Sequence, residues 1–137
     1  MRIMGIDYGD ARTGVAFSDL LCSIVGSTDV IHSRNQEKTL DQLCILIKEK
    51  EVGKIVVGLP KNMDGSEGVR AELCREFADK LRQRTGLPVD LWDERRTTVE
   101  AHNILSEHNY HGKKRKNTVD AVAASLILEG YIAFLGR

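Results

Sequence analysis

The feature that most constrains the fold is a short, continuous apolar run between two amphipathic segments. The run, residues 54–58, reads Lys-Ile-Val-Val-Gly, and an uninterrupted apolar stretch of this length is typical of a strand buried on both faces of a sheet. Residues 35–50 before it and 66–86 after it carry apolar side chains at the i, i+3, i+4, i+7 spacing of a helix. A buried strand between two such helices indicates right-handed crossovers onto a parallel sheet, and therefore an α/β fold.

The segments around this run predict a mixed sheet. Strands are expected over residues 4–7, 13–18 and 23–31, and the first two are joined by a turn that contains glycine and aspartate. Short turns let these three strands form an antiparallel meander, whereas the strands at 54–58 and 89–93 are parallel because helices separate them. We therefore expect a mixed five-stranded sheet flanked by helices. The helices are expected to begin near Asn35, Ser66, Thr97, and Asn117 or Thr118.

Length and composition are those of one globular domain over residues 1–137. Hydrophobic residues make up 42% and charged residues 29% of the chain, close to the globular average. No apolar stretch is expected to span a bilayer, and an aspartate interrupts the first apolar run too early for a signal peptide, so we expect a cytoplasmic protein. Cys22, Cys44 and Cys74 are too irregularly spaced for a disulfide framework or a zinc site, and we expect packing thiols.

The charge balance limits how the chain could bind a polyanion. Lys and Arg number 20, as do Asp and Glu, so the net charge is zero. This balance argues against nucleic-acid binding through bulk electrostatics. Two local basic clusters remain, at residues 95–96 and 113–116, so any nucleic acid must be bound through local patches.

Acidic residues occur at the ends of predicted strands and on the last predicted helix. Asp7 closes the first strand, Asp93 and Glu94 end the last strand, and Asp120 lies on the final helix. Ligands of α/β sheets gather where strands end, and strand alternation lets only one of Asp93 and Glu94 point to a given face. Each acid also has a structural explanation, since Asp7 could be a turn residue and Asp120 could stabilise the first turn of its helix.

Three carboxylates from distant parts of the chain would suit two Mg²⁺ or Mn²⁺ ions. These cations prefer oxygen ligands, and a pair about 4 Å apart can activate water and stabilise the leaving oxygen of a phosphodiester. Without cations, the clustered acids would repel one another. The four histidines (His32, His102, His108 and His111) are scattered, which gives a zinc site little support.

Four motifs, in order along the whole chain, carry a family resemblance. They are Ile6-Asp7-Tyr8-Gly9 with Arg12-Thr13-Gly14-Val15-Ala16, Val57-Gly58-Leu59-Pro60 through Asn62-Met63-Asp64-Gly65-Ser66-Glu67-Gly68, Asp93-Glu94-Arg95 with Thr97-Thr98, and Asp120-Ala121-Val122-Ala123-Ala124. Together they resemble the YqgF family, whose members are assigned as Holliday junction resolvases and pre-16S rRNA processing nucleases with a ribonuclease H-like fold. The resemblance implies that Asp7 and Asp120 are catalytic metal ligands, with Glu94 as the third and Asp93 as its rival.

The resemblance also implies a function and a partner. The expected activity is that of a metal-dependent endonuclease that processes the 5′ end of pre-16S rRNA in ribosome biogenesis. The alternatives are a Holliday junction resolvase acting on branched DNA and a non-catalytic nucleic-acid-binding module of the same fold. An actin-like phosphotransferase is set aside, because that fold needs two such domains. The sequence leaves a monomer and a homodimer open.

Several polar residues near these motifs are expected to contact structured RNA or branched DNA. Backbone recognition is favoured over base stacking, because aromatic residues make up only 5% of the chain. The expected nucleic-acid-binding residues are Arg12, Lys61, Asn62, Arg95, Lys113, Lys114, Arg115 and Lys116.

Overall fold

The computed structural model describes residues 1–96 and 112–136, with the side chains of residue 96 and residues 112–117 outside the description. The strands are β1 (Arg2–Asp7), β2 (Arg12–Ser18), β3 (Val25–His32), β4 (Val52–Leu59) and β5 (Val89–Asp93). The helices are α1 (Gln36–Glu49), α2 (Val69–Thr85), the short 3₁₀ helix η1 (Glu94–Arg96) and α4 (Gly112–Leu135).

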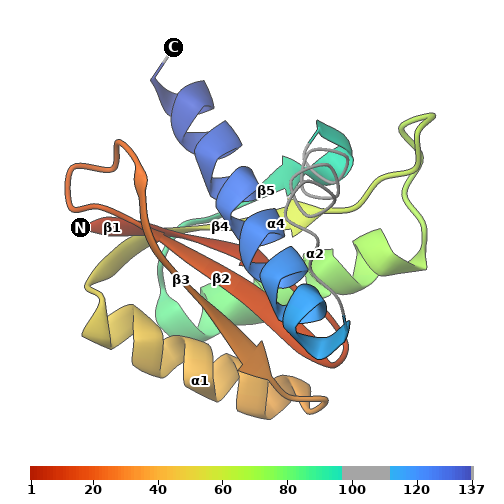
Figure 1. Cartoon of the computed structure of the whole chain (residues 1–137), viewed down its shortest axis with the longest axis horizontal. Coiled ribbons are helices and arrows are strands. Elements are labelled where there is room, and N and C mark those ends of the chain that lie inside the picture. The colour runs from red at the N-terminus through yellow and green to blue at the C-terminus, as the bar shows by residue number, and fades with distance from the viewer. Residues whose placement is uncertain (97–111, 137) are drawn as a thin grey trace.

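The five strands form one mixed sheet in the order β3-β2-β1-β4-β5. The pairs β1–β2 and β2–β3 are antiparallel, whereas β1–β4 and β4–β5 are parallel. The helices lie on both faces, with α4 crossing one face diagonally (Figure 1). The predicted meander followed by two parallel strands is confirmed.

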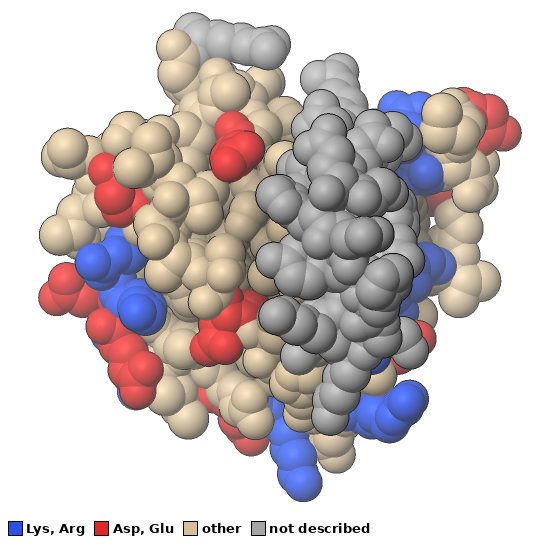
Figure 2. All heavy atoms as spheres, viewed as in Figure 1, with Lys and Arg blue, Asp and Glu red and all other residues tan. Residues whose placement is uncertain are grey.

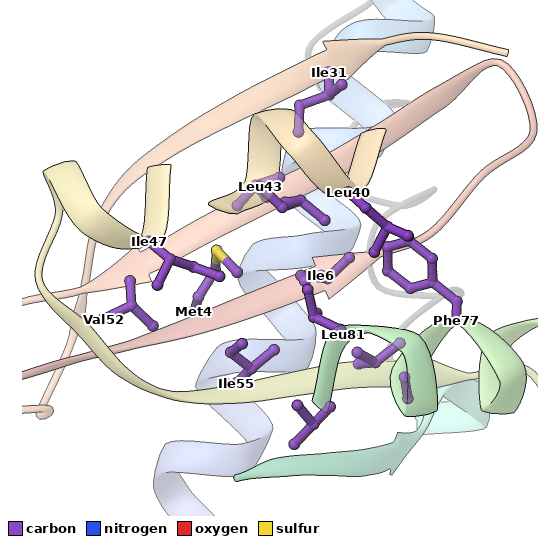
Figure 3. Close-up of a cluster of buried hydrophobic side chains, with 14 of the residues drawn as sticks. Met4, Ile6, Ile31, Leu40, Leu43, Ile47, Val52, Ile55, Phe77 and Leu81 are labelled. Atoms are coloured by element: carbon purple, nitrogen blue, oxygen red, sulfur yellow. The ribbon is translucent and has the colours of Figure 1, made fainter. Parts of the chain in front are cut away.

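The larger hydrophobic cluster lies between the sheet and the helices α1 and α2. Alternate strand residues such as Met4 and Ile6 point to this side, where they meet Leu40 of α1 and Phe77 of α2 (Figure 3). All four side chains are at most 1% exposed. Burial of this kind stabilises the fold by about 1.5–3 kcal/mol for each large side chain.

The opposite face of the sheet is covered by α4. Ile3, Ala16 and Val56 form a second buried cluster with residues of this helix. The helix residues in the cluster are Ala124, Ile127, Leu128 and Tyr131.

Helix α4 corrects one expectation about apolar stretches. Its residues Thr118–Leu135 are long and apolar enough to cross a membrane by length and composition, although no such stretch was expected. The core helix of a soluble protein has the same length and composition. Since α4 packs on β1, β2, β3 and β4, we assign it to the core.

Glycines let α4 lie directly on the sheet. A side chain at Gly14 would overlap the main-chain carbonyl oxygen of Asp120, and one at Gly5 would come within 2.9 Å of the Leu128 Cβ. At Gly14 and Gly5, backbone and Cβ atoms of α4 occupy the space that a side chain would fill. The main chain of α4 is therefore held at a fixed place over β1 and β2.

The ends of α1 and α2 show how well local signals predict helix boundaries. Asn35 caps α1 by accepting the Lys38 amide at 3.1 Å, and Gly86 ends α2 in a left-handed conformation (φ 69°), both as predicted. The predicted cap at Ser66 is wrong. Its amide and hydroxyl bond Asp64 within the preceding loop, and α2 begins three residues later.

The start of α4 is also corrected. The helix begins at Gly112, about five residues before the predicted start at Asn117 or Thr118. Asp120 therefore lies beyond the first turn, so stabilisation of the helix terminus does not explain it. The helix predicted from Thr97 to about His108 lies outside the described residues.

The cysteines match the expectation of packing thiols. Cys74 is buried, Cys22 and Cys44 are half-buried, and all three are free. Burial raises the pKa of the Cys74 thiol to about 12, which leaves it unreactive near neutral pH.

The contact between Gly14 and α4 predicts the effect of adding one methyl group. We expect Gly14→Ala to lower the free energy of unfolding by at least about 2 kcal/mol, because a Cβ there meets main-chain atoms that cannot rotate away. Urea denaturation followed by circular dichroism measures this change. The matched control is Gly26→Ala in β3, whose Cβ would have no neighbour closer than 3.7 Å. It should alter the free energy by less than about 0.5 kcal/mol, and an equal loss in both variants would contradict the argument.

Candidate active site

Strand alternation places Asp7 on the side of the sheet that α4 covers. Ile3 and Gly5 of β1 both contact α4, and side chains two residues apart share a face. Asp7 is the next residue in this series, at the carboxyl end of β1.

Glu94 reaches the same side from the end of β5. Its Oε1 lies 2.6 Å from the position that a Cβ of Gly58 would occupy. Because Gly58 has no side chain, the Glu94 carboxyl group fits against β4 beneath α4.

Asp7 and Glu94 form a hydrogen-bonded acid pair. Burial raises the pKa of Asp7 above its usual range, although its hydrogen bond with Glu94 opposes the shift. Burial, together with the charge of Asp7, raises the pKa of Glu94 to about 9. The pair therefore retains a proton at neutral pH when no cation is present.

Asp120 approaches the pair from α4. It lies four and seven residues before the buried Ala124 and Ile127, so it shares their sheet-facing side. Burial raises the pKa of Asp120, and the neighbouring Arg12 opposes that rise. The charge of Asp120 in turn raises the pKa of Asp7. Asp7, Glu94 and Asp120 therefore lie on the same side of the sheet, and the charge of Asp120 acts on Asp7.

Arg12 forms an ion pair with Asp120. Its Nε donates to Oδ2 at 2.9 Å, and the Asp120 side chain is only 18% exposed. Among the described residues, no group of three His, Cys, Asp or Glu side chains is spaced to hold one metal ion. The acids therefore lie as a proton-sharing pair and an arginine-bound third member.

Arg70 is a site residue that sequence reasoning missed. From the first turn of α2 it donates to the Tyr8 carbonyl at 2.6 Å and to Asp10 Oδ1 at 2.7 Å, and its charge lowers the pKa of both Asp7 and Glu94. A signal was present, because Arg70 lies four and seven residues before the buried Cys74 and Phe77. A charged residue on the apolar side of a helix usually has a specific partner.

Asp93, the rival of Glu94, has a different environment. Its carboxylate accepts hydrogen bonds from the main chain and the guanidinium of Arg95, with the closest contact at 2.6 Å, and these bonds lower its pKa. As the neighbour of Trp92, which packs on Tyr131 of α4, Asp93 points to the other side of β5. The geometry groups Glu94, rather than Asp93, with Asp7.

The other predicted nucleic-acid contacts are not all gathered at the acids. In the loop before α2, the Lys61 Nζ lies 3.8 Å from Oε2 of Glu67. In the same loop, the Asn62 side-chain amide donates a hydrogen bond to the Ser66 hydroxyl. Lys113, Lys114, Arg115 and Lys116 belong to the first turns of α4, but their side chains lie outside the described residues. On the described part of the face in Figure 2, Lys and Arg are scattered near the rim.

Comparison with known proteins identifies the family. The model of the RuvX family, described as Holliday junction resolvase, matches residues 1–133. The chain belongs to the RuvX family. RuvX and YqgF are two names of one family, so the family predicted from the motifs is confirmed, and with it the prediction of a nuclease.

Close relatives of this RuvX-family chain carry the provisional name of pre-16S rRNA nuclease. One from Halothermothrix orenii is 50% identical over 100% of this chain and 98% of its own length. One from Pelotomaculum thermopropionicum is 45% identical over 100% of this chain and 90% of its own. One from Clostridioides difficile is 43% identical over 97% of this chain and 94% of its own.

Two solved structures share the fold. RuvC of T. thermophilus in complex with a Holliday junction substrate has a TM-score of 0.61 at 12% identity, covering 100% of this chain and 97% of that one. The fowlpox virus Holliday junction resolvase has a TM-score of 0.61 at 12% identity, covering 98% and 99%. These similarities confirm the ribonuclease H-like fold predicted for this RuvX-family member.

Because the Asp7–Glu94 pair holds a proton, the difference in stability between wild type and Glu94→Gln should depend on pH. The pKa of Glu94 in the folded chain is raised from 4.5 to about 9, so the folded state binds more protons than the unfolded state between these values. The contribution of the pair to stability therefore falls as pH rises through this window. Glu94→Gln is neutral at every pH, so in EDTA it should gain stability relative to wild type from pH 5 to pH 9. Thermal unfolding of both proteins measures this gain, and a difference independent of pH would contradict the assignment.

Proposed function

We propose that this RuvX-family chain is a metal-dependent endonuclease that hydrolyses phosphodiester bonds of pre-16S rRNA and processes its 5′ end. The observation that carries the proposal is the convergence of Asp7, Glu94 and Asp120 on one side of the sheet. Burying acids together is unfavourable unless protons or cations neutralise them, so a structural role alone does not account for this arrangement.

The donor set fits Mg²⁺ or Mn²⁺. All three acids offer oxygen ligands, which hard divalent cations prefer, and Asp7 and Glu94 already share a hydrogen bond. Asp120 would complete the set for two ions after parting from Arg12. Bound cations would supply the activation of water and the stabilisation of the leaving oxygen.

The remaining residues of the site orient the acids and the substrate. Arg70 fixes the turn after Asp7 through its bonds to Tyr8 and Asp10, and the stacking of Tyr8 on Phe77, with ring centroids 4.0 Å apart, holds that turn against α2. In the cation-free site Asp7 and Glu94 share a proton, which bound cations would displace. We assign binding of the nucleic-acid backbone to Arg12, Lys61, Asn62 and Arg95, and to the basic first turns of α4.

The substrate follows from the relatives, several of which are named as pre-16S rRNA nucleases. A cytoplasmic location accords with that substrate. The second candidate is resolution of four-way DNA junctions, which the description of the RuvX family favours. Paired cuts in a junction need two active sites and therefore a homodimer, whereas RNA trimming needs one site and can be done by a monomer.

A parallel cleavage assay tests the activity and the substrate. We expect wild-type protein with Mn²⁺ or Mg²⁺ to cleave precursor 16S rRNA near its mature 5′ end, and Asp7→Asn to reduce the rate by at least about 100-fold while the fold survives. Gel analysis of precursor rRNA and of a four-way DNA junction measures both activities, and circular dichroism checks the fold. Cleavage of the junction alone would favour the resolvase, and equal activity of Asp7→Asn would refute the site. Metal-independent binding without cleavage of either substrate would support a non-catalytic module.

A second pair of variants separates Glu94 from Asp93. Glu94→Gln should reduce cleavage as strongly as Asp7→Asn, because it removes one carboxylate of the pair. Asp93→Asn should reduce cleavage less than tenfold, because Asp93 bonds Arg95 away from the pair. The two changes are chemically matched and adjacent in sequence. The reverse order of rate losses would assign the ligand role to Asp93.

A further inference from the structure

The two arginines near the acids are held in different ways. Arg70 donates to two separate acceptors, the Tyr8 carbonyl and Asp10 Oδ1, and its guanidinium lies over the Tyr8 ring at 5.3 Å. Among the described residues, Arg12 has one hydrogen-bond partner for its side chain, Oδ2 of Asp120. Within the described part of the chain, Arg70 is thus fixed by several contacts, whereas Arg12 is held by one ion pair.

The carboxylate in that ion pair cannot easily move away. The Asp120 main chain is pressed against Gly14 of β2, so its side chain starts from a fixed backbone position. Arg12 is 33% exposed, against 18% for Asp120. If the pair separates, the arginine is therefore the partner that can move.

Space for the released arginine lies beside the pair. A groove of about 570 Å³ runs between β3 and α4, lined by residues that include Asp29, His32, Thr118 and Ser125. His32 is paired with Arg12 across β2 and β3, so Arg12 begins its strand at the end of this groove. A guanidinium turned toward the groove would be free to bind a nucleic-acid phosphate, for which its planar set of donors is well suited.

We infer that Arg12 is an exchangeable counter-cation of Asp120, which leaves the carboxylate when a divalent cation binds and then binds a substrate phosphate. This inference rests on the proposed function. A divalent cation bound to Asp120 would repel the Arg12 guanidinium. The freed guanidinium would bind a substrate phosphate, and the same cation would attract that phosphate. Cation and substrate binding therefore reinforce each other through Arg12.

Cation affinity without substrate gives the first test. Isothermal titration calorimetry with Mn²⁺ should show binding about fivefold tighter to Arg12→Gln than to wild type, the size expected when a partly exposed ion pair no longer competes. The matched control is Arg95→Gln, which removes an arginine from Asp93 and should leave Mn²⁺ affinity within about twofold. Equal affinity of wild type and Arg12→Gln, or equal tightening in the control, would overturn the inference.

The second test observes the arginine itself. In ¹⁵N-labelled protein, the Arg12 Nε–H signal, assigned by its absence from Arg12→Gln, should shift or broaden when Mg²⁺ is added, and the Arg70 signal should stay in place. An unchanged Arg12 signal at saturating Mg²⁺ would show that the pair persists and would overturn the inference. Failure of the proposed function would look different from failure of this inference. Wild-type protein would then bind no Mn²⁺ through Asp7, or would cleave neither precursor 16S rRNA nor the four-way DNA junction. A wild type that binds Mn²⁺ and cleaves, with Arg12 unmoved, would refute this inference alone.

Discussion

The close contact between α4 and the sheet is the constraint on which the candidate site depends. Gly14 and Gly58 remove the side chains that would separate the two layers. One of these gaps receives the Asp120 main chain, and the other receives the carboxyl group of Glu94. The same close packing that builds this part of the core therefore positions two of the three acids, so the stability of the fold and the geometry of the site cannot vary independently.

The alternation of strand side chains then decides which acids meet. Asp93 and Glu94 are neighbours in sequence, but Asp93 is neutralised by Arg95, whereas Glu94 is half-buried and hydrogen-bonded to Asp7. The hydrogen bonds from Arg95 lower the pKa of Asp93, whereas burial and the charge of Asp7 raise the pKa of Glu94. Perturbed acids of the second kind are unfavourable for folding and are typical of functional sites.

The sequence predicted the features that depend on local periodicity. The apolar run around β4 and the short turns of the meander implied which strands are parallel and which antiparallel, and the acids at the ends of β1 and β5 implied one polar site. The features that were missed depend on contacts distant in sequence. Ser66 was predicted as a helix cap, but its amide and hydroxyl bond Asp64 instead. Arg70 was not singled out, because its partners Tyr8 and Asp10 lie about 60 residues away in sequence. The start of α4 at Gly112 was also missed, because the polar residues before Thr118 carry no apolar periodicity to place them in a helix.

A chain with no net charge can still attract a polyanion if its charge depends on bound cations. In the cation-free site, Arg12, Arg70 and a retained proton offset part of the negative charge of the three acids, and Arg70 is also paired with Asp10. Divalent cations would replace the proton and release Arg12 toward the groove, which would make the same surface more positive. Under this proposal, attraction of nucleic acid would be strongest at a site already loaded with cations for cleavage. The acids would then mark the region where the substrate is expected.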